Sequence, residues 1–396
     1  MRTRKISYSI ITSIAVLLVA VLLVKCTKKD MAAQPAAKSA ATKTVNATAT
    51  TFIHPGILNT QQSLDIIANQ ANSGNADRLA AYQYVLNYCN NHSPSGNYKA
   101  TVGVAGGVVT PDETSFKGDA LLAYALALRW AKTGTASYAT TVKQILDGWA
   151  NAFRNMSVTG DNSHQAALEA SWAAPTFAAA AEIIKYYQPT TGAAAGWTTA
   201  ENTQFVTFLN RLLNQYVVHA TDPGYHNNWD ISEGYAEMAI GVFEDNQTVY
   251  NNGLNLIKTV LPLDINADGS MPNEICGSHN DCVHFQYSLT GLSYAANIAG
   301  IQGDLSIYSA SNSRLLAGYN YQYQWYTNTL SNPPTCTNCT TSGKIWPGIN
   351  SADRHYNTTA TNYIQSHYNP DSDGLPGGDV SFLCWTNYTH HNVVLN

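Results

Sequence analysis

The sequence predicts an all-α fold, an α/α toroid in which antiparallel helical hairpins form an incomplete or closed barrel. Segments with helical spacing of apolar residues recur from Asn59 onward, and polar Gly/Asn/Pro/Thr turns separate them. Few runs show the period-two alternation of strands. Helices joined by short loops form antiparallel pairs that stack as a solenoid or close into a ring. No internal repeat is visible, which disfavours the ordinary solenoid families.

Composition limits the classes of protein. The chain has 396 residues, 45% of them hydrophobic and 12% charged, enough for one large domain or two small ones. A net charge of −5 argues against nucleic-acid binding, which needs a basic surface. The 24 tyrosines and eight tryptophans fit a sugar-binding surface, although an aromatic core explains them equally well.

The N-terminus has the pattern of an export signal. Residues 1–26 carry a basic start, then an apolar stretch that ends at Cys26. Leu23-Val24-Lys25-Cys26 resembles a bacterial lipoprotein cleavage site with Cys26 as the lipidated residue; because Lys25 replaces the usual small residue, an uncleaved anchor is the alternative. Residues 27–51 are rich in Ala, Thr, Ser and Lys and predict a flexible tether. We therefore expect residues 52–396 to form one monomeric domain in the bacterial cell envelope, attached to the membrane only through the N-terminus.

The helices are expected in a regular series. In chain order they cover about 61–72, 76–91, 117–133, 136–153, 164–187, 200–217, 230–243, 247–260, 284–300 and 305–326. The stretch GDALLAYALALRWAKTG is apolar around most of its circumference, which predicts a buried helix.

Six cysteines follow Cys26, an even number that suggests disulfides in an exported chain. Fifteen connectivities are possible. The simplest one pairs Cys276 with Cys282, Cys336 with Cys339, and Cys89 with Cys384. A zinc site at Cys336 and Cys339 is the alternative, but no second Cys/His pair follows at finger-like spacing.

The stretch YHNNWDISEGYAEMAIGVFEDN predicts a helix that starts near Asp230, with Asp230 and Glu233 spaced like a capping box. His226, Asn227 and Asn228 then gather at a helix N-terminus, where backbone amides favour an anion. A plain capping role for the two asparagines is the alternative.

A second polar stretch, SHNDCVHFQYSL, combines histidine and tyrosine. On a helix that begins near Cys282, His284 and Tyr287 share a face. A tyrosine beside a histidine in a cleft can exchange protons, although a phenol with a pKa of about 10 needs help near neutrality. A core tyrosine beside a surface histidine is the alternative.

Several segments together resemble the alginate lyase superfamily of α/α-toroid polysaccharide lyases. DGSMPNE followed by HFQYSLTGLSYAANIAGIQG resembles the family's "G-x-L-P-N-E" turn and its helix with a "Y-x-L" tyrosine. NNWDISEGYAEMAIGVFEDN is similar to the earlier catalytic helix, and HPGILNTQQSLD and SWAAPTFAAAAEII match further segments. The resemblance spans most of residues 52–330 and implies an α/α toroid that cleaves an anionic polyuronate.

The resemblance implies that Tyr287 is the catalytic tyrosine and that Asn228 neutralises the substrate carboxylate. Two positions depart from the family: Trp229 follows the asparagine where a histidine is usual, and Asn280 stands where an arginine precedes the tyrosine. The candidates for the missing histidine are His164, His226 and His284.

Such a lyase removes the C5 proton of a uronic acid and expels the 4-linked oxygen. In β-linked mannuronate and glucuronate the C5 hydrogen and O4 lie on the same ring face, so Tyr287 can accept the first proton and return one. Mannuronan, alginate or glucuronan is therefore favoured over polyguluronate. Residues expected to contact the sugar chain are Asn227, Trp229, His164, Gln165, Trp172, Arg354 and His355.

No cofactor is expected. DINADG copies the start of an EF-hand loop, but Ile275 occupies the position of the bidentate glutamate, so we interpret it as a turn, with bound calcium as the alternative. His279, Asp281 and His284 also contain metal-binding groups, yet three ligands from one short segment without a fourth do not predict a dedicated site.

Two other functions fit parts of the sequence. An α/α-toroid glycoside hydrolase would use paired carboxylates, with Glu169, Glu233, Glu237 and Asp119 as candidates. A non-catalytic glycan-binding lipoprotein would need only aromatic residues and a tether. New reducing ends without an unsaturated sugar would identify the first, and binding without product the second.

Overall fold

The computed structural model describes residues 51–160, 162–277, 279–339, 345–368 and 382–394. The predicted export signal with Cys26, and the predicted tether up to residue 50, lie outside these residues. Contacts group Thr51–Asn396 into one compact unit. No helix in the described part of the chain is long and apolar enough to cross a membrane.

The described residues are mostly helical, as the sequence predicts. The helices are α1 (Gln61–Asn72), α2 (Ala76–Asn91), α3 (Pro111–Thr133), α4 (Ala136–Ala152), α5 (Gln165–Tyr186), α6 (Thr199–Gln215), α7 (Asn228–Phe243), α8 (Gln247–Asp264), α9 (His284–Ile301), α10 (Ser306–Tyr326), α11 (Gly348–Tyr356), α12 (Thr359–Ser366) and α13 (Thr386–Thr389), with a short 3-10 helix η1 (Val217–His219) before α7.

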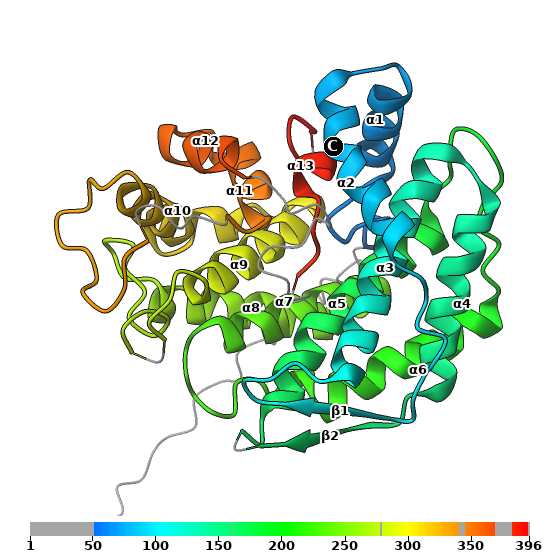
Figure 1. Ribbon diagram of the computed structural model, residues 1–396, viewed down its shortest axis with the longest axis horizontal. Helices are drawn as coiled ribbons and strands as arrows, with labels where there is room; N and C mark the ends of the chain where they lie inside the picture. The colour runs from blue at the N-terminus through cyan, green and yellow to red at the C-terminus, as the bar shows by residue number, and fades with distance from the viewer. Residues whose placement is uncertain (1–50, 161, 278, 340–344, 369–381, 395–396) are drawn as a thin grey trace, which may run out of the picture. The chain divides into compact units, whose positions relative to one another are not determined.

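Alternate helices form an inner layer. Helices α3, α5, α7 and α9 pack side by side in that order, and α11 packs on α9 (Figure 1). Helices α4, α6, α8 and α10 each pack outside an inner helix and complete the hairpins. Every residue of α7 is buried, and so are most of α5 and α9. Their apolar and small residues surround the helix axis, the pattern of a helix covered on all sides.

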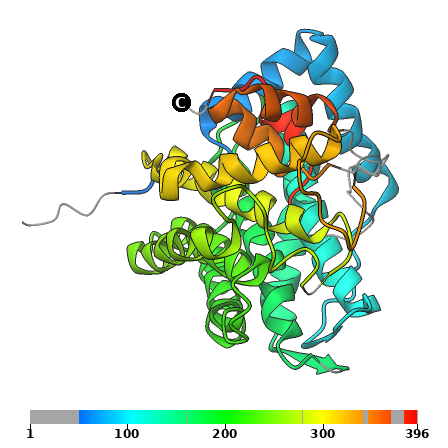
Figure 2. The same cartoon turned by 90° about the vertical axis from the view of Figure 1, so that its left-hand side faces the viewer.

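The two ends of the chain meet. Helix α13 contacts α11 on one side and α1 and α2 on the other. Figure 1 shows α13, in red, between the blue α1–α2 pair and the orange α11–α12 pair, and in the turned view the orange helices pass in front of it (Figure 2). Arg78 of α2 fixes this contact, because its buried guanidinium donates to the carbonyl oxygens of Asn387, Tyr388 and His391. Because α1 and α2 both pack on α3, the inner helices, α11, α13 and the α1–α2 pair form a closed circuit of contacts.

Two short strands were missed by the sequence reasoning. β1 (Thr101–Ala105) and β2 (Asn155–Thr159) form a parallel pair with Thr101 opposite Asn155. Each strand is followed by an inner helix, α3 or α5. The pair is small, but its ends lead into the cleft described below.

Two predicted helix starts were placed too late in the chain. α3 begins at Pro111 because Thr110 and Glu113 form a capping box around it. α7 begins at Asn228 because Asn227 is the N-cap and Asp230 completes its capping box. The carboxylate of Glu233, which we expected to help cap α7, accepts instead from the backbone N–H of Thr221 at 2.8 Å.

The predicted disulfide pairing was wrong. The structure joins Cys276 to Cys336 and Cys282 to Cys339, and in both pairs the Cα atoms lie 5.6 Å apart. The loop before α9 lies against the loop after α10, so each cysteine meets one from the other loop. Cys89 and Cys384 form no disulfide. Because Cys336 and Cys339 are both oxidised, the alternative of a zinc site on this pair is excluded.

Candidate active site

A cleft of about 930 Å³ opens where the ends of β1 and β2 meet the starts of α5, α7 and α9. Gly106, Gly107, Gly160 and Asn162, which follow the two strands, form part of its wall. Seven of the predicted site residues line it: Gln165, Trp172, Asn227, Asn228, Trp229, His284 and Tyr287.

Asn228 is held in place by a buried carboxylate. Glu274 accepts from the backbone N–H of Asn228 at 2.6 Å and from its side-chain Nδ2 at 2.9 Å. The hydroxyl of Ser288 donates to the same carboxyl group at 2.5 Å. Burial raises the pKa of Glu274 to about 7, against the opposing effect of these hydrogen bonds. One hydrogen of the Asn228 amide is thereby committed to Glu274, and the orientation of the amide is fixed.

Tyr287 lies in the first turn of α9 between aromatic rings. Its ring stacks on Trp172 of α5 with centroids 5.3 Å apart and an angle of 15°, and it meets Trp346 at 4.4 Å. Trp172 is fixed in turn by a 3.0 Å hydrogen bond from its Nε1 to Ser232. A phenol packed between two indoles has little rotational freedom, so the position of its hydroxyl is well defined.

A buried charge cluster supports the α5 side of the cleft. Lys117 lies 2.8 Å from Glu169 and 3.1 Å from Glu113, and all three side chains are buried. Burial raises the pKa of Glu169 to about 7, although Lys117 opposes this. Glu169 also accepts from the amide of Gln165 at 2.7 Å. Gln165 is thus held at the cleft wall by a group that does not itself reach the cleft.

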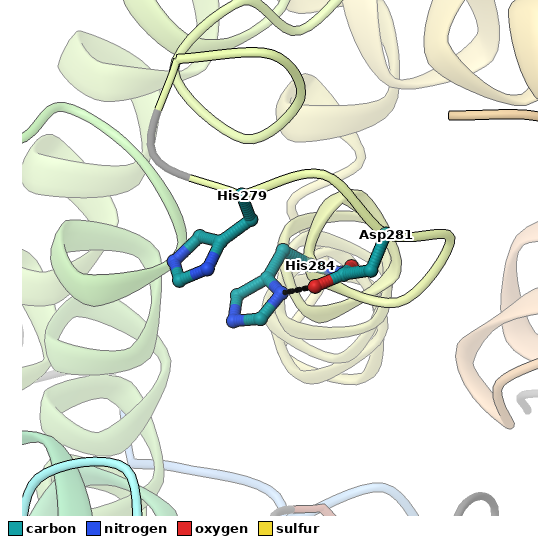
Figure 3. Close-up of side chains that lie close together, drawn as sticks. All are labelled: His279, Asp281 and His284. Carbon is teal, nitrogen blue, oxygen red and sulfur yellow. Dashed lines mark hydrogen bonds and ion pairs between the residues drawn. The ribbon is translucent and has the colours of Figure 1, made fainter. Parts of the chain in front are cut away.

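His279 and His284 line one side of the cleft, and Asp281 lies beside His284. Figure 3 shows the three side chains together. His284 Nδ1 lies 2.7 Å from a carboxylate oxygen of Asp281, and the rings of His279 and His284 stack with centroids 3.3 Å apart. Although burial alone would raise it, hydrogen bonds from His284 and Val283 hold the pKa of Asp281 well below its ordinary value. Burial, followed by the charge of His284, lowers the pKa of His279.

Four predicted site residues do not line the cleft. His226 lies just before α7 with its side chain about half exposed, and its Nδ1 is 3.7 Å from Asp230. His164 precedes α5, where its backbone N–H donates to Asn162 at 3.1 Å. Arg354 donates to the carbonyl of Val393, and His355 stacks on Tyr308 with centroids 3.8 Å apart. The last two belong to α11 and help hold the C-terminal region.

The four carboxylates considered for glycoside hydrolysis are all buried, and three of them bind other groups of the protein. Glu169 pairs with Lys117, Glu233 accepts from Thr221, and Asp119 accepts from Ser95 and from the indole of Trp149. Glu237 is 5% exposed. Among the described residues that line the cleft there is no aspartate or glutamate, and hydrolysis needs two carboxyl groups on either side of the bond.

The EF-hand-like stretch forms a turn. Asp264 is the last residue of α8 and is completely buried. The N–H of Asn266 donates to Ser270 O at 2.9 Å, the N–H of Gly269 donates to Asn266 O at 3.0 Å, and Asp268 accepts from Ser270. These bonds close the loop on itself.

Sequence reasoning missed Glu274 and gave His279 only a metal-binding role. Glu274 stands in the PNE segment of the motif that suggested the family, but nothing in the spacing indicates that it contacts Asn228, 46 residues earlier. His279 was visible as part of the SHNDCVHFQYSL stretch, and its stacking on His284 depends on the disulfide-bonded loop. Nothing in the sequence around Trp346 indicates that it packs on Tyr287.

Comparisons with known proteins identify the family. The alginate lyase family profile matches residues 67–331. The fold is similar to that of alginate lyase A1-III from Sphingomonas species A1, with 19% identity, a TM-score of 0.59 and coverage of 85% of this chain and 97% of that one. An alginate lyase from Bacteroides ovatus matches with 12% identity and a TM-score of 0.64, over 81% of this chain and 97% of that one. A search of curated proteins gives no significant match.

One of the matching structures contains a sugar ligand. It is a variant of alginate lyase A1-III complexed with a tetrasaccharide, with 19% identity and a TM-score of 0.61, and the match covers 86% of this chain and 99% of that one. The structural matches confirm the predicted α/α toroid. With two thirds of the sequence matched by the family profile, the chain belongs to the alginate lyase family and is a polysaccharide lyase.

Proposed function

We propose that the enzyme cleaves a 4-linked polyuronate, either the mannuronate-containing chain of alginate or glucuronan, by β-elimination. The main support is that Asn228 and Tyr287, the two residues matched to the family's catalytic positions, line one cleft. The absence of carboxylates among the described lining residues further favours elimination over hydrolysis.

Asn228 has the role of stabilising the enolate that forms when C5 loses its proton. The charge of the uronate carboxylate makes this proton poorly acidic, so donors must reach the carboxylate as negative charge develops. Asn228 lies at the N-terminus of α7, where the helix dipole also favours an anion. One amide hydrogen is held by Glu274, and the other is directed to the substrate.

Tyr287 has the role of accepting the C5 proton and returning a proton to the O4 leaving group. A single residue suffices for β-mannuronate and glucuronate, because both groups lie on one face of the ring. Guluronate has the opposite arrangement and would need a second base. The proposed substrate therefore excludes polyguluronate.

His284 takes the assisting role for which His164 and His226 were the other candidates. Of these three histidines it alone lines the cleft, and its ring centroid lies 5.4 Å from that of Tyr287. Asp281 orients the imidazole through the 2.7 Å contact with Nδ1. Trp172 and Trp229, which also line the cleft, offer flat faces for sugar rings. Export to the cell envelope, where such polymers are met, is part of this proposal.

A panel of polymannuronate, polyguluronate and glucuronan tests the function through the ultraviolet absorbance of the 4,5-unsaturated product. We expect product from polymannuronate or glucuronan and little from polyguluronate. New reducing ends without this absorbance would indicate hydrolysis, and no product from any polymer would contradict the proposal.

The variant Tyr287→Phe tests the assignment of the proton carrier. Loss of the phenol should lower kcat by at least about 10³-fold, while polymer binding is retained, because the ring still packs between Trp172 and Trp346. Tyr225→Phe is the matched control, since Tyr225 also lines the cleft but is not matched to a catalytic position. Equal activity of Tyr287→Phe and the unaltered enzyme would show that the assignment is wrong.

A further inference from the structure

We propose that His279, Asp281 and His284 bind a divalent transition-metal ion of the zinc class at the edge of the catalytic cleft. One ligand atom from each residue lies within 4.8 Å of the other two, and they form the one such group of three among the described residues (Figure 3). Two imidazoles and a carboxylate are a ligand set that zinc prefers, whereas calcium requires oxygen ligands.

The loop that carries these ligands is cross-linked on both sides. Cys276 precedes His279 and is joined to Cys336, while Cys282 lies between Asp281 and His284 and is joined to Cys339. Both partners belong to the loop after α10. A segment tied to its neighbour at two points loses less conformational entropy when it binds an ion, so the cost of assembling the site is reduced.

The carboxylate of Asp281 is oriented by its own hydrogen bonds. Its Oδ1 accepts from the backbone N–H groups of Val283, at 2.8 Å, and His284, at 3.0 Å. Its Oδ2 is therefore directed to the imidazole of His284, 2.7 Å from Nδ1. Metal binding would replace the proton shared by this pair, and both histidines would bind as neutral rings.

A small rearrangement completes the geometry. An ion about 2.1 Å from each ligand in a tetrahedron needs ligand separations of about 3.4 Å. Ligand atoms that lie up to 4.8 Å apart must therefore approach by as much as about 1.4 Å, whereas His284 Nδ1 and Asp281 Oδ2, 2.7 Å apart, must separate by about 0.7 Å. The side chains of Asp281 and His284 are 40% and 28% exposed, which leaves them room to rotate. The stacked rings of His279 and His284 must also tilt, so that their nitrogens point to a common centre.

Three protein ligands leave the fourth position of the ion open. His279 and His284 both line the cleft, so this position faces the substrate space. An open position in a cleft is typical of catalytic zinc and accepts an anionic oxygen. The carboxylate of a uronic acid would supply one, and the ion would add positive charge close to Tyr287, where Trp229 and Asn280 replace the family's histidine and arginine. This role rests on the proposed function, but the binding of the ion does not.

Calorimetric titration of the chelator-treated, purified protein with Zn²⁺ tests the site, and the visible absorption of bound Co²⁺ reports its geometry. We expect one ion per chain, with tetrahedral Co²⁺ bands. His279→Ala and His284→Ala should each weaken binding at least about tenfold. Asp281→Asn should also weaken it, while the side-chain oxygen of asparagine can still accept from the backbone N–H groups of Val283 and His284. If an alanine variant does not fold, glutamine at the same position replaces it.

His219→Ala is the matched control. His219 contacts Asp222 at 3.0 Å with the same three-residue spacing as His284 and Asp281, but no other described residue forms a group of three ligands with them. Its loss should leave the titration unchanged. No binding of Zn²⁺, or binding that survives both histidine substitutions, would overturn the site.

Lyase assays on the same samples separate the two proposals. Product formation without Zn²⁺ binding would leave the proposed function intact and contradict the metal site. Stoichiometric binding lost in the histidine variants, in a protein that cleaves no polyuronate, would support the site and contradict the function.

Discussion

At the scale of single residues, the active cleft depends on buried groups that do not face it. Glu274 accepts from the backbone N–H of Asn228 and from one hydrogen of its side-chain amide, and it is completely buried. The sequence indicates Asn228 and Tyr287 because each belongs to a recognisable segment. It does not indicate Glu274, because this contact depends on how three segments meet around one carboxyl group. Arg354 and His355 show the opposite error. We expected them to contact the sugar chain, but Arg354 donates to Val393 and His355 stacks on Tyr308. From the sequence alone, a polar residue that packs a helix looks the same as one that binds substrate.

Glu274→Gln tests the orienting role of this carboxyl group. The new amide accepts through one oxygen only and presents a donor to one of the N–H groups of Asn228. We expect kcat to fall about 100-fold with little change in KM, because a small displacement of a reacting group has this effect. Steady-state kinetics on polymannuronate would measure it.

Ser288→Ala is the control, because it removes one donor to Glu274 and leaves both bonds to Asn228. It should reduce kcat far less. Wild-type activity in Glu274→Gln would show that Asn228 needs no such support.

At the scale of elements, the sequence predicts α1 and α2 to the residue and most other helices to within a few residues. The errors have physical causes. The start of α3 was missed although Thr110, Pro111 and Glu113 carry a clear capping signal. β1 is too short for its alternation of Val102 and Val104 to stand out, and its pairing with β2 joins segments more than fifty residues apart.

The loop between α8 and α9 depends on disulfides that the sequence did not pair correctly. Cys282 and Cys339 are 57 residues apart, so their cross-link removes about 4 kcal/mol of unfolded-state entropy. Replacing both with serine should lower the melting temperature and reduce kcat, because the loop carries His279, Asp281 and His284. Thermal unfolding and lyase assays would measure both effects.

Cys89→Ser is the matched control, because Cys89 lies on α2 outside any disulfide. Unchanged kcat in the double variant at a temperature where it remains folded would show that the loop is positioned without this cross-link.

At the scale of the whole molecule, closure of the helix circuit depends on Arg78. Its guanidinium satisfies three carbonyl groups near α13 and also donates to Gln70 at 2.9 Å. Lysine keeps the charge but cannot reach all of these acceptors from one position. Arg78→Lys should lower the free energy of unfolding by about 3 kcal/mol, measured by urea denaturation. Arg129→Lys, at a more exposed site on α3, should cost less than about 1 kcal/mol, and equal effects of the two would contradict the proposed closure.

The buried glutamates give the whole molecule a pH-dependent stability, and Glu237 is the clearest case. It is 5% exposed, and burial, aided by the charge of Glu233, raises its pKa to about 8. The folded protein therefore binds a proton at Glu237 that the unfolded chain releases near its ordinary pKa of about 4.3. The stability that Glu237 contributes is complete below a pH of about 4.3. It decreases as the pH rises from there to about 8, because in this range the native state holds a proton that the unfolded state has released, and above about pH 8 it is lost.

Glu237→Gln should remove this part of the dependence. Between about pH 5 and about pH 8 the unaltered protein should lose about 3–4 kcal/mol more stability than the variant, which chemical denaturation at both values would measure. Glu201→Gln is the control: hydrogen bonds from Thr198 lower the pKa of Glu201, so its contribution is lost only at lower pH and the slope in this window should not change. If Glu237→Gln and the unaltered protein lose stability equally, Glu237 is ionised in the folded state, and water or a neighbouring group must compensate its burial.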